Sequence, residues 1–313
     1  MLEFSPMGPY CTENVPLSRH TTLKTGGVAR YFVSVQTVEE LGAAIAFARQ
    51  RQVPHFILGG GSNLLVADAG FPGLVIKMEI MGRQYEDYSG DMVRLVVGAG
   101  ENLDAVITDA VTKGYAGIEN LSGIPGTVGA TPVQNVGAYG VEVKDVILAV
   151  ETYHVPTAKS VVMSNEECRF GYRDSFFKTT QGAEYVITAV HFRLSTEAAV
   201  NVAYRDLALR FAQEAAPSPA AVREAVIAIR SEKFPDWHTV GTAGSFFKNP
   251  VISAADAENL RARFPELPLY EAAPGQMKVS LGYVLDKICG LKGHTNGKVG
   301  LYEKQALVLV ATQ

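Results

Sequence analysis

The chain has 313 residues, of which 47% are hydrophobic and 19% charged, a globular composition long enough for roughly two domains. It carries 28 Lys and Arg against 32 Asp and Glu, so it lacks the basic excess that nucleic-acid binding needs. Three widely spaced cysteines, Cys11, Cys168 and Cys289, show no metal-ligand spacing, which argues against a disulfide framework and a metal site.

The N-terminal segment MLEFSPMGPYCTENVP has neither a basic start nor an apolar run, so it does not read as a signal peptide. No other stretch is long and apolar enough to span a bilayer. We therefore expect a cytoplasmic protein without membrane insertion.

The first third of the chain alternates helix and strand signals. Residues 37–52 open with a capping box, Thr37 to Glu40, and place apolar residues at helical spacing. The stretches FILGGGSNLLV and GLVIKM predict strands, the first broken by glycines. Residues 93–114 predict a strand, a glycine-rich turn and a helix that ends at Gly114.

Beyond residue 140 the pattern favours strands. VKDVILAVETYHV is rich in β-branched residues, and EYVITAVHFRLS alternates apolar and polar positions. The last third predicts helices that begin at Ser218 and Ser253, with a further one in SLGYVLDKICG. This order predicts an α+β protein with a partly antiparallel sheet and a boundary near residue 196.

Two segments contain more glycine than ordinary turns need: LGGGSN at residues 58–63 and SGIPGTVGATPVQNVGAYG at residues 122–140. Glycine lets backbone N–H groups converge on an anion and lets a ligand approach closely, so both segments are candidate phosphate cradles for a nucleotide. One such loop is more often a turn, but two of them in one domain favour a site. GAGENL has Leu103 in place of the third glycine of a Rossmann fingerprint, which makes that interpretation weak.

Four motifs in chain order resemble the UDP-N-acetylenolpyruvoylglucosamine reductases (MurB) of bacterial peptidoglycan synthesis: LGGGSN, GIENLSGIPGTVGATPVQNVGAYG, ECRFGYRDSFFK and GTAGSFFKNP. The resemblance runs from about Leu17 to Val310, and VAYRDL around Tyr204 resembles the subgroup in which a tyrosine loop closes over the substrate. It implies an FAD-binding fold of the vanillyl-alcohol-oxidase type in two subdomains, residues 17–80 and 81–196. A C-terminal α+β substrate-binding domain would occupy residues 197–313.

The same resemblance implies a reaction and its cofactors. NADPH would reduce FAD, and the flavin would pass hydride to the enolpyruvyl group of UDP-N-acetylglucosamine enolpyruvate, giving UDP-N-acetylmuramate. We expect a monomer. The residues that match the family's FAD-binding segments are Gly59, Gly60, Gly61, Ser62, Asn63, Gly123, Ile124, Pro125, Gly126, Gly129, Gly137, Ala138, Tyr139 and Gly140.

Two residues match the family's catalytic positions. Hydride transfer pushes negative charge toward the substrate carboxylate, and Arg173 matches the arginine that stabilises it with a planar, permanently charged fork. Ser245 matches the proton donor, with Gly241 and Gly244 bracketing a small-residue turn before it and two phenylalanines after it to exclude water. Outside these motifs, a surface pair with Asp174 and an ordinary turn serine would be the default interpretations.

Five further residues match substrate-contacting positions of the family, although each could equally be solvated surface or scaffold: Tyr172, Tyr204, Lys233, Asn249 and Gln305. Family members continue beyond the QALVLV strand to a glutamate that cooperates in protonation, whereas this sequence stops at Gln313, and we expect truncation. One alternative is a protein that binds FAD and UDP-sugar but is impaired in catalysis. Another is a flavin oxidase of the same fold, although the His or Cys that often tethers FAD there is missing from both glycine-dense loops.

Overall fold

The computed structural model describes residues 11–197, 200–214 and 216–311, which form two compact units. The first unit contains the described residues up to Leu17 together with Gly26–Gly61 and Val66–Arg230. The second contains Ser18–Thr25, Ser62–Leu65 and the described residues from Ser231 onward. Two short N-terminal segments therefore belong to the same unit as the C-terminal part of the chain.

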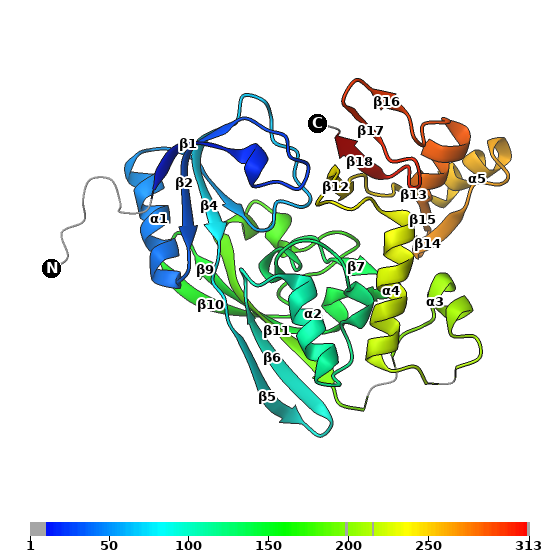
Figure 1. Cartoon of the computed structure of the whole chain (residues 1–313), viewed down its shortest axis with the longest axis horizontal. Coiled ribbons are helices and arrows are strands. Elements are labelled where there is room, and N and C mark those ends of the chain that lie inside the picture. Colours follow the sequence, from blue (N-terminus) through cyan, green and yellow to red (C-terminus); the bar gives the residue numbers. More distant parts are fainter. Residues whose placement is uncertain (1–10, 198–199, 215, 312–313) are drawn as a thin grey trace. The chain divides into compact units, whose positions relative to one another are not determined.

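The first sheet of the first unit has the strand order β1-β2-β4-β3. Its strands are β1 (Thr12–Pro16), β2 (Val28–Val35), β3 (His55–Leu58) and β4 (Phe71–Met78). β1 pairs antiparallel with β2, whereas β2 and β3 both pair parallel with β4. The helix α1 (Val38–Gln50) connects β2 to β3 and lies beside this sheet (Figure 1).

The start of α1 confirms the predicted helix. Thr37 Oγ1 accepts the N–H of Glu40 at 3.2 Å, and the apolar residues at helical spacing are buried. The Glu40 carboxylate reaches one residue further back than a capping box requires and accepts the N–H of Gln36 at 2.7 Å. Two backbone donors at the helix N-terminus are satisfied in this way.

The second sheet of the first unit is antiparallel throughout, in the order β10-β9-β11-β6-β5. Its strands are β5 (Arg83–Ser89), β6 (Met92–Gly98), β9 (Ile147–His154), β10 (Lys159–Ser164) and β11 (Tyr185–Ser195). The helix α2 (Leu103–Thr112) follows β6, with Asn102 as its N-cap and Gly114, at φ +81°, just beyond its end. The predicted strand, glycine-rich turn and helix of residues 93–114 are confirmed.

One hydrophobic cluster joins the two sheets and both helices of the first unit. Its fully buried members include Leu41 of α1, Ile76 of β4, Leu95 of β6, Ile107 of α2 and Phe192 of β11. A fully buried side chain of this size contributes about 1.5–3 kcal/mol to folding. The glycine-rich loops follow β3 and α2, whose positions this core determines.

The rest of the first unit lies around the 122–140 loop. A short hairpin of β7 (Gly137–Ala138) and β8 (Val141–Glu142) ends the loop. The helices α3 (Arg205–Arg210) and α4 (Pro219–Lys233) follow, the last three residues of α4 belonging to the second unit. Val222, Ala225, Val226 and Ile229 are buried in a smaller cluster with Tyr139 and Leu207, as the predicted helical face requires.

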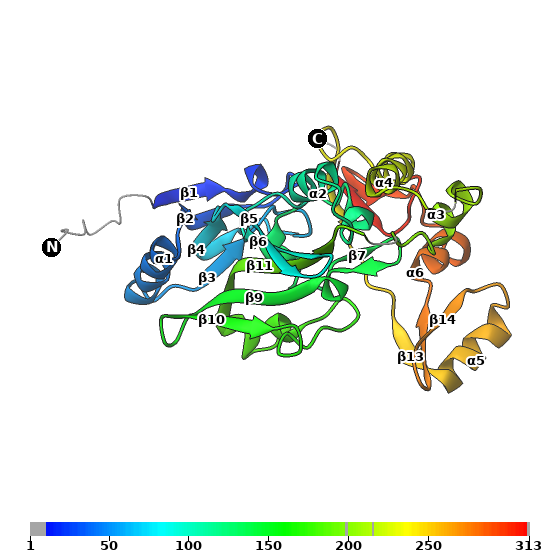
Figure 2. The same ribbon diagram turned by 90° about the horizontal axis from the view of Figure 1, so that it is seen from below.

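The second unit holds two small sheets. One has the order β12-β18-β17-β16, formed by β12 (Gly241–Ser245), β16 (Thr295–Asn296), β17 (Val299–Leu301) and β18 (Val308–Ala311). The other has the order β13-β15-β14, formed by β13 (Val251–Ser253), β14 (Leu269–Ala273) and β15 (Gln276–Val279). The helix α5 (Ala254–Arg263) lies beside the second of these sheets (Figure 2), and the short α6 (Leu281–Tyr283) continues into a π-helix at Val284–Ile288.

The structure corrects one local expectation here. Residues 241–245 form the strand β12 rather than a turn, because Gly241 and Thr242 pair with Ala311 and Val310 of β18. The segment Ser18–Thr25 supports the other side of the strand, where Thr22 Oγ1 donates to the Thr242 carbonyl at 2.6 Å. In the part of the chain that the structure describes, no helix is both long and apolar enough to cross a membrane.

Candidate active site

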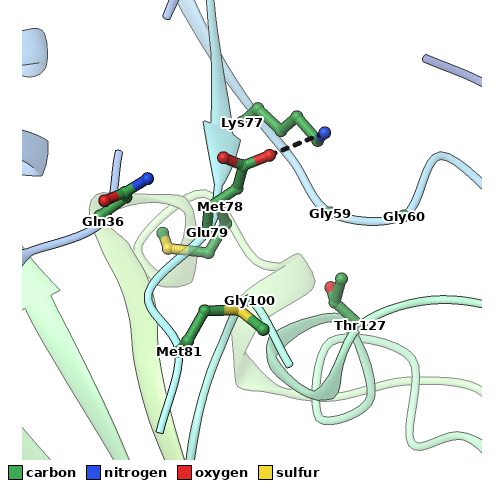
Figure 3. Close-up of a pocket in the computed structure, with 9 residues that line it drawn as sticks. All are labelled: Gln36, Gly59, Gly60, Lys77, Met78, Glu79, Met81, Gly100 and Thr127. Atoms are coloured by element: carbon green, nitrogen blue, oxygen red, sulfur yellow. Dashed lines mark ion pairs between the residues drawn. The ribbon is translucent and has the colours of Figure 1, made fainter. Parts of the chain in front are cut away.

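A cavity of about 650 Å³ lies within the first unit (Figure 3). Its walls come from the ends of β2, β3, β4 and β6 and from the 122–140 loop: Gln36, Gly59, Gly60, Lys77, Met78, Glu79, Met81, Gly100 and Thr127. This volume is within the usual range of small-molecule sites. The cavity lies where the first glycine-rich loop leaves β3.

The two glycine-rich loops meet at this cavity. A Cβ added at Gly59 would lie 2.5 Å from Thr127 Oγ1, and one at Gly60 would lie 2.7 Å from the Cα of Gly126. Gly126 itself has a φ of +128°, which favours glycine. Any side chain at Gly60 would therefore overlap the backbone of the other loop. The structure thus brings together Gly59, Gly60 and Gly126, which the sequence places almost seventy residues apart.

Other predicted cofactor residues are more widely distributed. Gly129 packs against Ala99 after β6, where an added Cβ would meet the alanine Cβ at 2.5 Å. Ser62 and Asn63 belong to the second unit, in which Asn63 Nδ2 donates to the carbonyl of Ala243 in β12 at 3.0 Å. The last residues of the 122–140 loop, from Gly137, enter the β7–β8 hairpin, and none of them lines the cavity.

Sequence reasoning missed several lining residues. Lys77 and Glu79 form an ion pair of 2.8 Å at the end of β4, next to Gln36 and above Met81 and Gly100 (Figure 3). Gly100 and Thr127 lie in stretches already recognised as glycine-rich, so proximity to those motifs could have identified them. The charged pair has no such signal, because it lies at a strand end outside every motif.

Arg173 is held by the backbone of the 122–140 loop. Its guanidinium donates to the carbonyl oxygen of Gly137 at 2.7 Å and to that of Asn135 at 3.3 Å. The residue has a φ of +52°, a left-handed conformation that is uncommon for a side chain of this size. Among the residues described, no ion pair joins it to Asp174, whose carboxylate accepts the N–H of Ser175.

Two asparagines attach the segment before Tyr204 to the end of the same loop. Asn120 is fully buried, and its Nδ2 donates to the carbonyls of Tyr139 and Asn201, each at 2.8 Å. Asn201 Nδ2 donates in turn to the carbonyl of Gly140 at 3.1 Å. The rings of Tyr139 and Tyr204 meet edge to face at 5.3 Å. Tyr204 is the N-cap residue of α3 and is 44% exposed. The bonds of the two asparagines therefore fix the segment that leads to it.

Ser245 lies at the exposed end of β12 in the second unit. Gly244 before it has a φ of +66° and open space around its Cα, so glycine serves the backbone conformation there rather than close packing. The strand register shifts between Thr242 and Ser245, which turns the end of β12. Phe246 and Phe247 stack edge to face at 5.5 Å and are 36% and 42% exposed, so their role in excluding water stays a prediction.

The remaining candidates occupy both units. Tyr172 precedes Arg173 in the first unit, whereas Lys233, Asn249 and Gln305 belong to the second. Lys233 is the last residue of α4. Asn249 Oδ1 accepts the N–H of Leu281 at 3.1 Å, which gives this side chain a structural bond at the start of α6 and leaves its amide donors for another partner.

Comparison with known proteins identifies the family. The FAD binding domain family matches residues 29–163, and the C-terminal domain of UDP-N-acetylenolpyruvoylglucosamine reductase matches residues 236–313. The reductase of Chromobacterium violaceum is 44% identical over 300 residues, which cover 95% of this chain and 87% of that protein. This chain belongs to the UDP-N-acetylenolpyruvoylglucosamine reductase family.

Two further members of the family are also similar to this chain over most of its length. The UDP-N-acetylenolpyruvoylglucosamine reductase of Neisseria gonorrhoeae is 42% identical over 297 residues, covering 94% of this chain and 85% of that protein. The crystal structure of the Thermus caldophilus reductase (MurB) superposes with a TM-score of 0.66 at 30% identity, covering 96% of this chain and 88% of that one. The predicted fold class, an FAD-binding domain followed by the reductase C-terminal domain, is confirmed.

The cavity of this reductase fits the cofactor of its family. Gly59 and Gly60 line the cavity without side chains, and their lack of a Cβ lets the two loops meet there, which leaves backbone groups for a diphosphate. The two methionines offer apolar, polarizable surface to a flat ring, and Gln36, Lys77 and Glu79 offer hydrogen-bonding groups. FAD, which the sequence predicted, is the cofactor of this family, and the donor set present in the cavity is compatible with it.

Proposed function

We propose that this chain catalyses the NADPH-dependent reduction of UDP-N-acetylglucosamine enolpyruvate to UDP-N-acetylmuramate, a step in peptidoglycan precursor synthesis. The observation that carries the proposal is the bond from Arg173 to Gly137. It attaches the proposed carboxylate-binding arginine to the same loop that contributes Thr127 to the cavity. This supports a proposal in which one segment of the first unit serves both the cofactor and the substrate anion.

The glycine-rich loops are the proposed cofactor site. Bound FAD would supply the hydride acceptor and donor that connects NADPH to the enolpyruvyl group. Gly59 and Gly60, which line the cavity, would hold its diphosphate through backbone N–H groups, together with Gly126 of the loop that they meet. The other cofactor residues expected from the sequence, in the 58–63 and 122–140 loops, stay proposed FAD contacts.

Arg173 is the proposed electrophilic residue. Arrival of hydride at the terminal vinyl carbon places negative charge on the substrate's α-carbon and carboxylate. A guanidinium already oriented by the Gly137 and Asn135 carbonyls would stabilise that charge without reorganising. Its two backbone bonds leave further N–H donors for the carboxylate, since a guanidinium has five.

Ser245 is the proposed proton donor to the α-carbon. Its exposed position at the end of β12 leaves the hydroxyl open to a ligand. The hydroxyl is a weak acid, so it needs hydrogen-bond reach to the carbanionic carbon, and the left-handed Gly244 lets the strand end present it. In the proposed reaction Arg173 would stabilise the charge and Ser245 would supply the proton.

Tyr204 is the proposed substrate clamp, which would place the chain in the subgroup with a closing tyrosine loop. The residue is 44% exposed while the segment before it is bonded to the 122–140 loop, which suits a residue that contacts a ligand. Tyr172, Lys233, Asn249 and Gln305 are proposed as further substrate contacts. A cytoplasmic location and a monomeric state stay predictions from the sequence.

The proposed function is tested with purified protein, NADPH and the enolpyruvyl substrate. We expect bound FAD, NADPH oxidation that depends on the substrate, and a product heavier by two hydrogens. UDP-N-acetylglucosamine, which lacks the enolpyruvyl group, serves as the control and should not promote NADPH oxidation. Equal oxidation with both sugars, or a protein that binds no flavin, would exclude the proposal.

A further inference from the structure

Asp104 connects three segments of the first unit through one carboxylate. Its Oδ1 accepts the N–H of Gly123 at 2.6 Å and Nη1 of Arg223 at 2.6 Å, and its Oδ2 accepts Nη2 of Arg223 at 2.9 Å. Asp104 lies in the first turn of α2, Gly123 begins the 122–140 loop, and Arg223 lies on α4. The side chains are 32% and 18% exposed, so solvent reaches the pair only in part.

The loop is held at a second point by the residue next to Asp104. The N–H of Leu103 donates to the carbonyl of Gly126 at 3.1 Å, and Asn102 forms a β-bridge with Thr127. Three consecutive residues at the start of α2 therefore fix positions 123, 126 and 127 of the loop. The latter two are those that meet Gly60 and Gly59 at the cavity.

Gly123 passes between α2 and one face of α4. A Cβ added there would lie 2.8 Å from Ile227 Cδ1 and 3.2 Å from Arg230 Nε. With Arg223, these residues have i, i+4, i+7 spacing and form one helical face toward the loop. Gly123 also has a φ of +70°, so its conformation and its closeness to α4 both require glycine. The N–H of Gly123 is held by the Asp104 carboxylate.

We propose that Asp104 is a positioning residue for FAD binding, setting the path of residues 123–127 through Gly123 and holding them against α4 through Arg223. The inference rests on the proposed role of the 122–140 loop in binding FAD. A carboxylate that accepts a backbone N–H forms a short, charge-assisted bond, which suits it to fixing a loop. Arg223 fixes the orientation of the Asp104 carboxylate, because it donates two parallel hydrogen bonds to it.

The test measures the FAD dissociation constant of the apoprotein by quenching of flavin fluorescence, with thermal unfolding of the apoprotein recorded in parallel. Asp104→Ala removes the acceptor for both partners, and we expect FAD to bind at least tenfold more weakly. Asp104→Asn keeps an oxygen for Gly123 but loses the ion pair, so binding should be weakened less. Arg223→Met should resemble Asp104→Asn, because it leaves the Gly123 bond intact.

The matched control is Asp109→Asn on the same helix, whose carboxylate bonds Tyr85 and Lys113 instead of the loop. It should leave FAD affinity within twofold of the parent. FAD affinity of Asp104→Ala within twofold of the parent would overturn the inference. So would equal effects of Asp104→Ala and Asp104→Asn, because these would show that Gly123 is not what Asp104 positions. A parent that binds no FAD would instead refute the proposed function, and the inference with it.

Discussion

The guanidinium of Arg173 donates to the carbonyl oxygen of Gly137 at 2.7 Å. An added Cβ at Gly137 would lie 3.3 Å from Nη1 of the same arginine, so a side chain at this position would crowd the guanidinium. Gly137 belongs to the loop whose earlier residues form part of the cavity wall. About ten residues of backbone therefore connect the proposed cation to the proposed cofactor site. Changes near the cavity should affect FAD binding, whereas changes at Arg173 should affect reaction with the substrate.

Replacement of Arg173 should separate the two half-reactions. Arg173→Ala should slow reoxidation of the reduced flavin by the enolpyruvyl substrate by about 10²-fold or more, since one preorganised charge contact is removed. Reduction of the flavin by NADPH should stay within a few-fold of the parent. Stopped-flow absorbance of the flavin measures both steps. The control is Arg169→Lys, because Arg169 contacts the ring of Phe176 instead of the loop. Equal loss in both half-reactions would contradict the proposed role.

Ser245→Ala should also act on the second half-reaction alone. Loss of a general acid slows proton transfer by about 10²–10⁴-fold, so reoxidation by substrate should become slow while NADPH reduction is kept. Ser160→Ala, at an exposed serine of β10, is the matched control and should behave as the parent. A Ser245→Ala variant with normal reoxidation would remove the serine from the mechanism.

Asn201→Ala should loosen the segment that carries Tyr204. The change removes the bond to the Gly140 carbonyl and the bond that Asn201 Oδ1 accepts from the Ala203 N–H. Two bonds of roughly 1 kcal/mol each predict a rise in the substrate KM of up to about thirtyfold, with flavin reduction unchanged. Asn165→Ala is a close control, since Asn165 also bonds two backbone groups, the carbonyls of Lys144 and Ile147. Similar KM values for both variants would contradict the prediction.

Gly60→Ala should abolish tight FAD binding. The added Cβ would meet the Gly126 Cα at 2.7 Å, and two backbones cannot separate as a flexible side chain would. We expect at least a tenfold weaker FAD affinity by fluorescence titration. Gly282→Ala adds the same methyl group where the nearest atom, Leu307 Cγ, is 3.5 Å away, and should bind FAD normally. Parent-like affinity in Gly60→Ala would show that the loops separate without cost.

The stability of the first unit should depend on pH through Asp104. Burial raises the pKa of this carboxyl, but bonds from Arg223 and Gly123 outweigh burial and hold the pKa below its ordinary value. The ionised form therefore stabilises the fold above about pH 4, and this contribution is lost as the pH falls through the folded pKa. Urea unfolding should show a difference between the parent and Asp104→Asn that is constant near neutrality and shrinks in acid.

The stability contribution of Glu119 should change with pH in the opposite direction to that of Asp104. Burial raises the pKa of its carboxyl above the ordinary value, despite a bond from the N–H of Gly117. Relative to Glu119→Gln, the parent should therefore be most stable in acid and lose stability as the pH rises through the folded pKa. Parallel pH profiles for the two variant pairs would contradict one of the two assigned directions.

The sequence by itself determined the family, the helix starts and the positions of the glycine-rich loops. Thr37 and Ser253 cap their helices as expected, because an N-cap needs only residues within one turn of the chain. The motifs around Arg173 and Ser245 were recognisable for the same reason, since each is a short continuous string. Such features depend on neighbours within a few residues, so they can be read along the chain.

Only the tertiary structure decided which distant residues meet. Residues 241–245 were expected to form a turn, and they form a strand because their pairing partner lies almost seventy residues later in β18. The contact of Gly60 with Gly126, the lining of the cavity by Lys77 and Glu79, and the Asp104 carboxylate between Gly123 and Arg223 likewise join segments far apart in sequence. No local pattern encodes these contacts, because closing the intervening chain depends on the packing of the whole core.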